Sequence, residues 1–221
     1  LDALPWTEGL RQWQARVVGL RRWMPELDLP DLSDAALLAT LDTWLRPAFA
    51  GKTRLDALAE DSLRPGRGYT VLPHTSKALT AVHCGIAPPL DSDNTEADAG
   101  SLPGKCLPQL LSEQGYGTAF FQTATDHFER RRSTVANFGY EHFTPVDEMD
   151  HFGFNRANYF GYEDDIMLEP SRRWIEENRD KPFMLGMLTV TGHHDYALEN
   201  FDLIDFVDDP LLNKYLNGIH Y

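Results

Sequence analysis

The segment Leu72-Pro73-His74-Thr75-Ser76-Lys77-Ala78-Leu79 passes from strand-forming to helix-forming residues at a hydroxyl side chain. Residues 69–71 before it favour a strand, and Pro73 ends strand pairing because it lacks a backbone donor. From Ser76 on, apolar residues recur at helical spacing until Gly85, a typical helix stop. The expected apolar stripe of this helix is Ala78, Leu79 and Val82. The segment therefore predicts a strand that turns directly into a short helix.

Thr75 would lie at the N-cap of that helix and is the first candidate for a catalytic residue. At this position, free backbone N–H groups and the positive end of the helix dipole stabilise an alkoxide or a phosphoryl or sulfuryl oxyanion. Such stabilisation is one way to activate a weak nucleophile. Threonine is also an ordinary N-cap residue that serves only the helix. Taken alone, these residues leave both interpretations open.

The composition of the 221-residue chain is that of a globular protein with one or two domains, since 42% of the residues are apolar and 24% are charged. Its net charge of −14 argues against nucleic-acid binding by the whole chain, because phosphate contacts need clustered Lys and Arg. We expect neither a transmembrane span nor a signal peptide in this sequence. Cys84 and Cys106 are too few for a disulfide framework and match no metal motif, so we expect buried or free thiols.

Charge divides the chain into two unlike parts. Residues 1–68 hold nine Lys or Arg against ten Asp or Glu, whereas the remaining residues hold eleven against twenty-four, and all eight histidines. The sequence Arg64-Pro65-Gly66-Arg67-Gly68 is typical of a linker. We therefore expect a first domain over 1–63, a linker over 64–68 and a second domain over 69–221.

The first domain is predicted to be a small all-α bundle. Apolar residues recur at helical spacing in two segments, one capped by Thr7 and the other capped by Ser33 and stopped by Gly51. A shorter helical segment follows over 54–63. Tryptophans at helical spacing are typical of packing, so the bundle shows no candidate site.

The second domain is predicted to be α/β, because strand and helix patterns alternate along it. Strands are expected at 118–122 and 141–144, and helices at 107–114, 127–137 and 165–178. The apolar run over 183–190 predicts a central parallel strand covered on both faces. It ends in Thr191-Gly192-His193-His194-Asp195-Tyr196. Ligand sites of open α/β sheets lie at the carboxyl ends of strands, so this loop is a second site candidate.

Three groups of polar residues in this domain have both a functional and a structural interpretation. His193 and His194 could bind an anion or a metal, or supply a proton; we expect one of them to act and the other to be a surface residue. The run Arg130-Arg131-Arg132 could clamp an anionic substrate by bidentate hydrogen bonds, or form a solvated helix face. Asp164 and Asp165 are predicted to cap the following helix.

Six motifs of residues 69–221 form an ordered series. They are His74-Thr75-Ser76, the helix and turn over 107–117, Phe138-Gly139-Tyr140, Tyr159-Phe160-Gly161-Tyr162-Glu163-Asp164, Lys181-Pro182-Phe183 and Thr189-Val190-Thr191-Gly192-His193. This series resembles the alkaline phosphatase superfamily, and within it the sulfatase-type domain of lipoteichoic acid synthases and related phosphoglycerol transferases. The expected fold is therefore a partial alkaline-phosphatase-like three-layer α/β sandwich with a mostly parallel sheet, preceded by the small all-α bundle.

The resemblance implies roles for three residues. Thr75 matches the family's threonine nucleophile and metal ligand, His193 matches its substrate-binding histidine, and Arg131 lies near its substrate-anion arginine. The implied cofactor is a divalent cation, Mn²⁺ first and Mg²⁺, Ca²⁺ or Zn²⁺ as alternatives. Such a cation lowers the pKa of the threonine hydroxyl and neutralises charge on the transferred group. Attack by Thr75 would give a phospho-threonine that an alcohol or water resolves.

The chain departs from the family pattern at the metal ligands. The family has an acidic ligand some tens of residues before the threonine, and an Asp-His pair after a later strand; neither is matched here. The resemblance thus implies a domain truncated at both ends with an incomplete ligand set, and one expectation is an inactive enzyme. The Cys-x-Pro-x-Arg motif of formylglycine sulfatases is absent, because Cys84 is followed by Gly85-Ile86-Ala87. Phosphotransfer or phosphodiester chemistry is therefore favoured over sulfate-ester hydrolysis.

Residues 1–63 resemble a different family. The sequences Leu4-Pro5-Trp6-Thr7, Leu29-Pro30-Asp31-Leu32-Ser33-Asp34 and Leu41-Asp42-Thr43-Trp44-Leu45 are similar to the C-terminal module of bacterial HrpB-type DEAH-box helicases. That module carries none of the ATPase motifs, and no Gly-x-x-x-x-Gly-Lys-Ser/Thr occurs in the chain. Helicase activity therefore cannot reside in this chain.

Three functional hypotheses remain open. The first is a metal-dependent phospho(glycerol)transferase, or a phosphodiester or sulfate-ester hydrolase, acting on an anionic ester. The second is a helicase-derived RNA- or protein-interaction module fused to a non-catalytic fragment, and the third is a non-catalytic fusion product. The sulfatase-like part implies the cell envelope or periplasm, in a family that is often membrane-anchored. The helicase-like part implies the cytoplasm.

Overall fold

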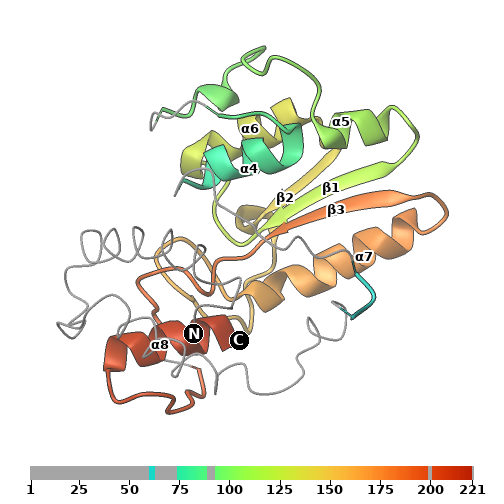
Figure 1. The fold of residues 1–221 in the computed structure, drawn as a ribbon. Coiled ribbons are helices and arrows are strands. Elements are labelled where there is room, and N and C mark those ends of the chain that lie inside the picture. The colour runs from blue at the N-terminus through green and yellow to red at the C-terminus, as the bar shows by residue number, and fades with distance from the viewer. Residues whose placement is uncertain (1–59, 63–73, 89–92, 199–200, 221) are drawn as a thin grey trace. The chain divides into compact units, whose positions relative to one another are not determined.

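Figure 1 shows the computed structural model of the chain, which describes residues 60–62, 74–88, 93–198 and 201–220. The predicted bundle and linker, except residues 60–62, lie outside the described residues, as do the strand-like residues before Thr75. The chain divides into two compact units. One consists of residues 69–200, and the other consists of residues 1–68 together with residues 201–221.

The unit of residues 69–200 is built on a parallel sheet. In it β1 (Gly117–Gln122) pairs with β2 (His142–Pro145) on one side and with β3 (Phe183–Leu188) on the other. In the register of β1 with β2, Ala119 lies opposite His142. All six residues of β1 are buried. The predicted α/β class and the positions of these strands are confirmed.

The strand predicted to be central is not the central one of the described sheet. Among the described strands β3 pairs only with β1, and its residues are exposed or half-buried. Phe183 and Met187 of this apolar run are 39% and 41% exposed. An apolar run predicts a strand, but the strand's place in the sheet depends on neighbours that the run itself does not specify.

Helices cover both faces of the sheet (Figure 1). Three lie over one face, namely α4 (Thr75–Cys84), α5 (Leu107–Ser112) and α6 (Arg131–Phe138). The opposite face is covered by α7 (Leu168–Asn178). This is the predicted three-layer arrangement.

Side chains of the central strand alternate between the two helical layers, as the pleat of a strand requires. Phe121 belongs to the core cluster that contains Trp174 of α7. Its neighbour Phe120 belongs to a second cluster, with Val135 and Phe138 of α6. The one strand thus contributes to both cores, which fixes its register against both layers.

One predicted helix is divided in two. The residues expected as a single helix over 127–137 form a short 3-10 turn, η2 (Phe128–Arg130), followed by α6. The division occurs because Glu129 and Arg130 both adopt a left-handed backbone conformation, each with φ of 51°. This conformation costs a non-glycine residue about 1 kcal/mol or more, so surrounding contacts must hold the turn. The predicted helix over 165–178 likewise starts as a 3-10 turn, η4 (Asp164–Met167).

The helix α4 buries a polar side as well as part of the predicted apolar stripe: Leu79 packs against a core cluster, but the prediction is wrong for Val82. Val82 is 76% exposed, whereas Ser76, Lys77 and His83 are buried. The buried ammonium of Lys77 has a carboxylate partner in another segment, Glu96, with Nζ and Oε2 2.8 Å apart. Hydrophobic periodicity cannot reveal such a face, because the partner that makes burial of the charge possible lies elsewhere in the sequence.

A disulfide joins Cys84, the last residue of α4, to Cys106, which precedes α5. The prediction of two free or merely buried thiols is therefore wrong. The cysteines are separated by 22 residues, and the packing of α4 beside α5 brings their Cα atoms within 4.0 Å. A count of two cysteines carries no information about such an approach.

Replacing both cysteines by serine is expected to lower the free energy of unfolding by about 3 kcal/mol, because the disulfide closes a loop of 22 residues in the unfolded chain. Equilibrium urea unfolding of the variant and of the unsubstituted chain, both without reductant, measures the difference. The unsubstituted chain in excess reductant should match the variant. Equal midpoints in all three samples would show that the bridge does not stabilise the fold.

The described part of the other unit is residues 60–62 and α8 (Pro210–His220) with the segment before it. The Asp209 carboxylate accepts a hydrogen bond from the Leu212 backbone N–H at 2.7 Å, in the first turn of this helix. The side chain of Asn217 accepts a hydrogen bond from the Ile204 N–H at 2.8 Å and ties the segment to the helix. No helix in the part of the chain that the structure describes has the length and apolar character of a membrane span.

Candidate functional site

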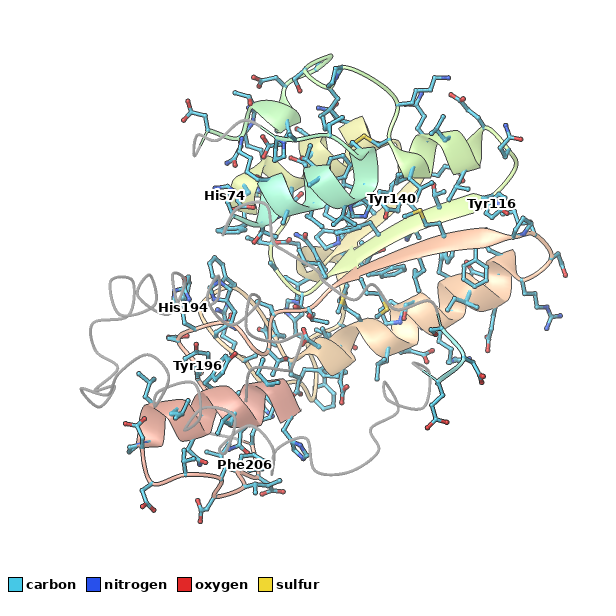
Figure 2. All side chains as sticks on the ribbon, viewed as in Figure 1. His74, Tyr116, Tyr140, His194, Tyr196 and Phe206 are labelled. Atoms are coloured by element: carbon cyan, nitrogen blue, oxygen red, sulfur yellow. A yellow bond between two sulfur atoms is a disulfide. The ribbon has the colours of Figure 1, made fainter. Side chains whose placement is uncertain are left out.

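A pocket of about 60 Å³ lies where β1 and β3 end and α4 begins. In Figure 2, His74 at the start of α4 and His194 on the loop after β3 mark this region. The lining residues are Thr75, Ala124, Phe128, Arg131, Phe160, Leu188, Thr189, Val190 and His193. Because about 10–15 Å³ of such space holds one water molecule, the pocket admits a group of a few heavy atoms. The three residues selected by the family resemblance thus meet in one small, mostly apolar pocket.

Thr75 is the first residue of α4 rather than its N-cap, which is His74. The predicted cap position is therefore wrong by one residue: His74 has extended backbone, with φ of −146°, and the helix begins after it. Thr75 lines the pocket, and no hydrogen bond joins its hydroxyl to another described residue. The adjacent Ser76 is fully buried, with its hydroxyl 3.1 Å from Asn94 Oδ1. Of these two neighbouring hydroxyl residues, only Thr75 borders the pocket.

Arg131 is the first residue of α6 and is only 1% exposed. Its Nη2 donates a hydrogen bond to Glu129 Oε2 at 2.8 Å, whereas Nε and Nη1 have no hydrogen-bond partner among the described residues. Burial lowers the pKa of the guanidinium below its usual value, although the Glu129 charge opposes this shift. Unpaired buried donors are costly, so an anion that enters the pocket would relieve them.

The other two arginines of the basic run have a different environment. Arg130 is half exposed and bonds the Asp98 carboxylate at 2.6 Å, and Arg132 is half exposed and bonds the Asp126 carboxylate at 2.6 Å. The interpretation as a solvated helix face therefore fits these two, and it is wrong for Arg131. A run of three like residues cannot show which one points inward when the backbone turns sharply within it.

Glu129 lies beside the pocket, in contact with Arg131 and outside the lining residues, and was missed by the sequence reasoning. Its Oε2 accepts hydrogen bonds from the Ser76 backbone N–H at 2.9 Å and from Arg131 Nη2 at 2.8 Å. Its Oε1 lies 3.4 Å from His74 Nδ1. The carboxylate thus occupies the positive end of α4, where an anion is stabilised by the helix dipole. No pattern in the sequence signals this role, because it depends on the left-handed turn at Glu129 itself.

His193 and His194 differ in position, although they are adjacent in sequence. His193 lines the pocket, and its Nδ1 lies 2.6 Å from the backbone oxygen of His194. A carbonyl oxygen can only accept, so Nδ1 carries a proton and Nε2 is the nitrogen left for a ligand. The ring of Phe160 packs edge-on to His193 at 4.4 Å between centroids. His194 instead bonds the hydroxyl of the exposed Tyr159 at 2.8 Å, outside the pocket lining.

Asp164 does not cap the helix that follows it, so that prediction is wrong. Its carboxylate accepts hydrogen bonds from the backbone N–H groups of Val190 at 2.6 Å and Thr191 at 3.1 Å, and from the hydroxyl of Thr123 at 3.3 Å. The residue therefore ties the loop after β1 to the loop after β3. Since Val190 lines the pocket, this bond network fixes one wall of the site.

Gly161 allows its own segment to approach the loop after β1 closely. A Cβ atom at this position would lie 1.9 Å from the backbone oxygen of Thr123. Only glycine therefore fits beside the loop after β1, where Ala124 and Gly161 form an antiparallel bridge. The glycine of the Tyr-Phe-Gly-Tyr motif has a packing role next to the pocket.

The described residues do not supply a site for a divalent metal. They contain no group of three or more His, Cys, Asp or Glu that could hold a metal ion. The carboxylate in contact with the start of α4 is that of Glu129, and its Oε2 is already used by the Ser76 N–H and by the positively charged Arg131. Thr75 with this carboxylate does not form a ligand set that suits Mn²⁺ or Mg²⁺, which need several free oxygen donors.

The sulfatase family model matches residues 48–221, most of the chain. The chain belongs to the sulfatase family. Phosphoglycerol transferase I of Citrobacter koseri is 26% identical over 137 residues, which are 59% of this chain and 17% of that enzyme. The ATP-dependent RNA helicase HrpB of Escherichia coli is 40% identical over 58 residues, which are 26% of this chain and 7% of the helicase. The chain thus spans less than a fifth of the length of either relative.

Two solved structures share the fold of this sulfatase-family chain. The lipoteichoic acid synthase LtaP from Listeria monocytogenes superposes with a TM-score of 0.58 at 20% identity, covering 68% of this chain and 37% of that one. A protein of the alkaline phosphatase superfamily from Vibrio parahaemolyticus gives 0.58 at 18% identity, covering 80% of this chain and 46% of that one. The alkaline-phosphatase-like fold is confirmed. Sulfatase-type domains act on anionic esters, and members of the superfamily are generally metal-dependent.

Proposed function

We propose that the pocket binds a phosphate or sulfate ester and that Thr75 is the nucleophile that attacks it. The chain would then be a phospho(glycerol)transferase or a phosphodiester or sulfate-ester hydrolase. One observation carries the proposal: Thr75, Arg131 and His193 come from distant parts of the sequence and line the same small pocket. A phosphodiester is the favoured substrate because the formylglycine motif of sulfate-ester hydrolases is absent.

In the proposed reaction Thr75 Oγ1 forms a bond to the phosphorus or sulfur atom, while the bond from that atom to the leaving oxygen breaks. The threonine proton passes to solvent, and the leaving alkoxide takes up a proton. Arg131 Nε and Nη1 donate to the non-bridging oxygens, whose charge grows during the attack. His193 Nε2 orients the ester. Water or an acceptor alcohol then attacks the same atom and releases Thr75.

A divalent metal is the implied cofactor, and we propose Mn²⁺, with Mg²⁺, Ca²⁺ or Zn²⁺ as alternatives. When bound, it would lower the pKa of the threonine hydroxyl. Because the described residues lack a suitable ligand set, its ligands would have to come from outside them. Without those ligands the pocket is expected to bind an ester and not to convert it.

We propose a cell-envelope or periplasmic location, as the family resemblance implies. The Cys84–Cys106 disulfide supports this location, because disulfides persist in oxidising compartments and are rare in the cytosol.

The test is binding and turnover of bis(4-nitrophenyl) phosphate by the full chain, with and without added Mn²⁺. We expect Arg131→Ala to weaken binding about a hundredfold, because a charge-assisted contact to a buried guanidinium is worth a few kcal/mol. The matched control is Arg132→Ala, which removes an exposed arginine of the same run. Equal binding by the two variants would overturn the proposed site, and binding without any release of nitrophenolate would overturn the catalytic part.

A second candidate function concerns residues 1–63, which we propose form a separate helicase-like domain joined by the linker 64–68 to the sulfatase domain over 69–221. The 40% identity to HrpB over 58 residues supports it. Such a module would bind RNA or a protein. Fluorescence anisotropy of labelled single-stranded RNA with the full chain tests the RNA part, and Arg131→Ala should leave any binding unchanged if the two functions are separate.

A further inference from the structure

We propose that Asn158 is a positioning residue for the pocket: its side chain holds the turn that carries His193, so that the imidazole is presented to a bound ester. The inference rests on the proposed function, in which His193 orients the ester. It concerns a residue that lies outside the motifs of the family resemblance and that does not itself line the pocket.

The side chain of Asn158 is buried between two walls of the pocket, with 2% of the residue exposed. Its Nδ2 donates to the backbone oxygen of Val190 at 2.6 Å and to that of His193 at 3.4 Å. Its Oδ1 accepts a hydrogen bond from the Phe160 backbone N–H at 3.0 Å. Because Val190, His193 and Phe160 all line the pocket, one buried amide bonds the backbone of three lining residues.

The turn over residues 190–193 depends on this amide. The His193 backbone N–H closes the turn by donating to the Val190 oxygen at 2.9 Å, and Asn158 donates to the same oxygen. Asp164 bonds only N–H groups at the start of the turn, whereas Asn158 bonds the carbonyl oxygens of its first and last residues. An unpaired buried carbonyl is costly, so loss of the amide is expected to change the turn.

The imidazole of His193 is held by contacts that start from the same backbone. Its Nδ1 donates to the His194 backbone oxygen at 2.6 Å, and its ring packs edge-on to Phe160. Asn158 bonds the backbone of both His193 and Phe160 and thereby fixes the orientation in which Nε2 is the nitrogen left for a ligand. The amide bonds only backbone groups here, so this role is expected with or without a divalent metal in the pocket.

The first test is the position of the imidazole proton, read from proton–nitrogen correlation spectra of the histidine rings of the full chain. The spectra are recorded without metal at pH 8, where histidine rings are ordinarily neutral. The His193 signals are identified by their loss in His193→Ala. We expect the proton on Nδ1 in the unsubstituted chain and a shift toward the form with the proton on Nε2 in Asn158→Ala. A proton on Nε2 in the unsubstituted chain would overturn the inference without any variant of Asn158.

The second test is binding of diphenyl phosphate, measured by isothermal titration calorimetry with Mn²⁺ in every sample. We expect His193→Ala to weaken binding about tenfold or more, since it removes a hydrogen bond to a charged ligand. Asn158→Ala should weaken binding by about threefold or more, and by no more than His193→Ala does. Because Asn158 acts through the imidazole, Asn158→Ala should have no further effect in a chain that already carries His193→Ala.

Asn137→Ala is the matched control. The Asn137 amide on α6 also donates to two backbone oxygens, those of Glu96 and Asp98, each at 2.9 Å, and neither acceptor lines the pocket. Only Asn158→Ala should change the His193 spectrum and the Kd. Circular dichroism and the urea midpoint establish that each variant is folded. If the alanine variant does not fold, Asn158→Asp is measured instead, since an ionised carboxylate keeps the acceptor and the size but cannot donate.

The outcomes separate this inference from the proposed function. If His193→Ala weakens binding but Asn158→Ala leaves both the Kd and the His193 spectrum unchanged, the positioning role is overturned and the ester site stands. Equal weakening by Asn158→Ala with and without His193 would show that the amide serves only the fold, and would also overturn the inference. If the unsubstituted chain does not bind the diester, or if His193→Ala binds it as tightly, the proposed function fails and the inference fails with it.

Discussion

Replacing Thr75 by alanine is expected to lower the turnover of a chromogenic phosphodiester by about a thousandfold or more, which corresponds to roughly 4 kcal/mol of lost transition-state stabilisation. The methyl group that remains cannot form the bond to phosphorus. Thr75→Ser keeps the hydroxyl and should retain most of the activity. The rate of nitrophenolate release at saturating diester, with Mn²⁺ added, is the measurement.

The pocket contains a second threonine, Thr189, and this residue provides the matched control. Thr189 follows β3 and is exposed, whereas Thr75 opens α4, where the helix dipole favours a developing negative charge. Thr189→Ala is therefore expected to keep turnover within about tenfold of the parent. An active Thr75→Ala together with an inactive Thr189→Ala would transfer the nucleophile to the other threonine and contradict the proposed mechanism.

The sheet and its helices could be predicted from the sequence because their signals are local. β1 and β3 are short apolar runs, and the helices around them end where glycine takes a left-handed conformation, as at Gly85 and Gly139. The position of the site could be predicted for the same reason, since the loop after a parallel strand lies at the edge of the sheet where ligands bind. The loop with His193 and His194 was proposed in this way. Thr75 was proposed from the change of strand to helix pattern, and the choice of His193 over His194 came from the family resemblance.

The features that were missed all depend on a partner far away in the sequence. The polar face of α4 can be buried because its groups have partners elsewhere. The Lys77 ammonium pairs with Glu96, 19 residues later, and the Ser76 backbone N–H donates to Glu129, 53 residues later. The inward direction of Arg131 depends on two successive left-handed residues, neither of which is glycine. Such a turn contradicts local preference, so only the tertiary contacts that hold it in place could have indicated it.

Replacing Lys77 by methionine is expected to lower the free energy of unfolding by about 3–5 kcal/mol, because it leaves a buried carboxylate without its counter-charge. Lys77 Nζ lies 2.8 Å from Glu96 Oε2, and the two side chains are 0% and 1% exposed. The ammonium also donates to the backbone oxygen of Asp93. Methionine has a similar volume, so the loss of packing is small and the loss of charge dominates. Urea unfolding at pH 7 is the measurement.

A double-mutant cycle of Lys77→Met with Glu96→Gln measures the interaction energy between these two side chains. Removing the carboxylate charge as well should recover part of the stability lost in Lys77→Met, because the uncompensated charge is then gone. The exposed pair of Lys105 with Glu113 is the control, and Lys105→Met should cost less than about 1 kcal/mol. Additive losses in the Lys77 and Glu96 cycle would mean that the buried pair does not act as a unit.

The pH dependence of the Lys77→Met effect has a defined sign. Burial tends to raise the pKa of Glu96, but hydrogen bonds from Lys77 and Ser76 outweigh it and hold the pKa below its usual value. A carboxyl group whose pKa is lowered by folding contributes stability above its unfolded pKa of about 4.3, and this stability is lost as the pH falls through the folded value. In Lys77→Met the same carboxyl is buried without its partner and is stabilised by protonation. The difference in unfolding free energy between parent and variant should therefore shrink as the pH is lowered from 7 toward 4, and a constant difference would contradict the assignment of the effect to this ion pair.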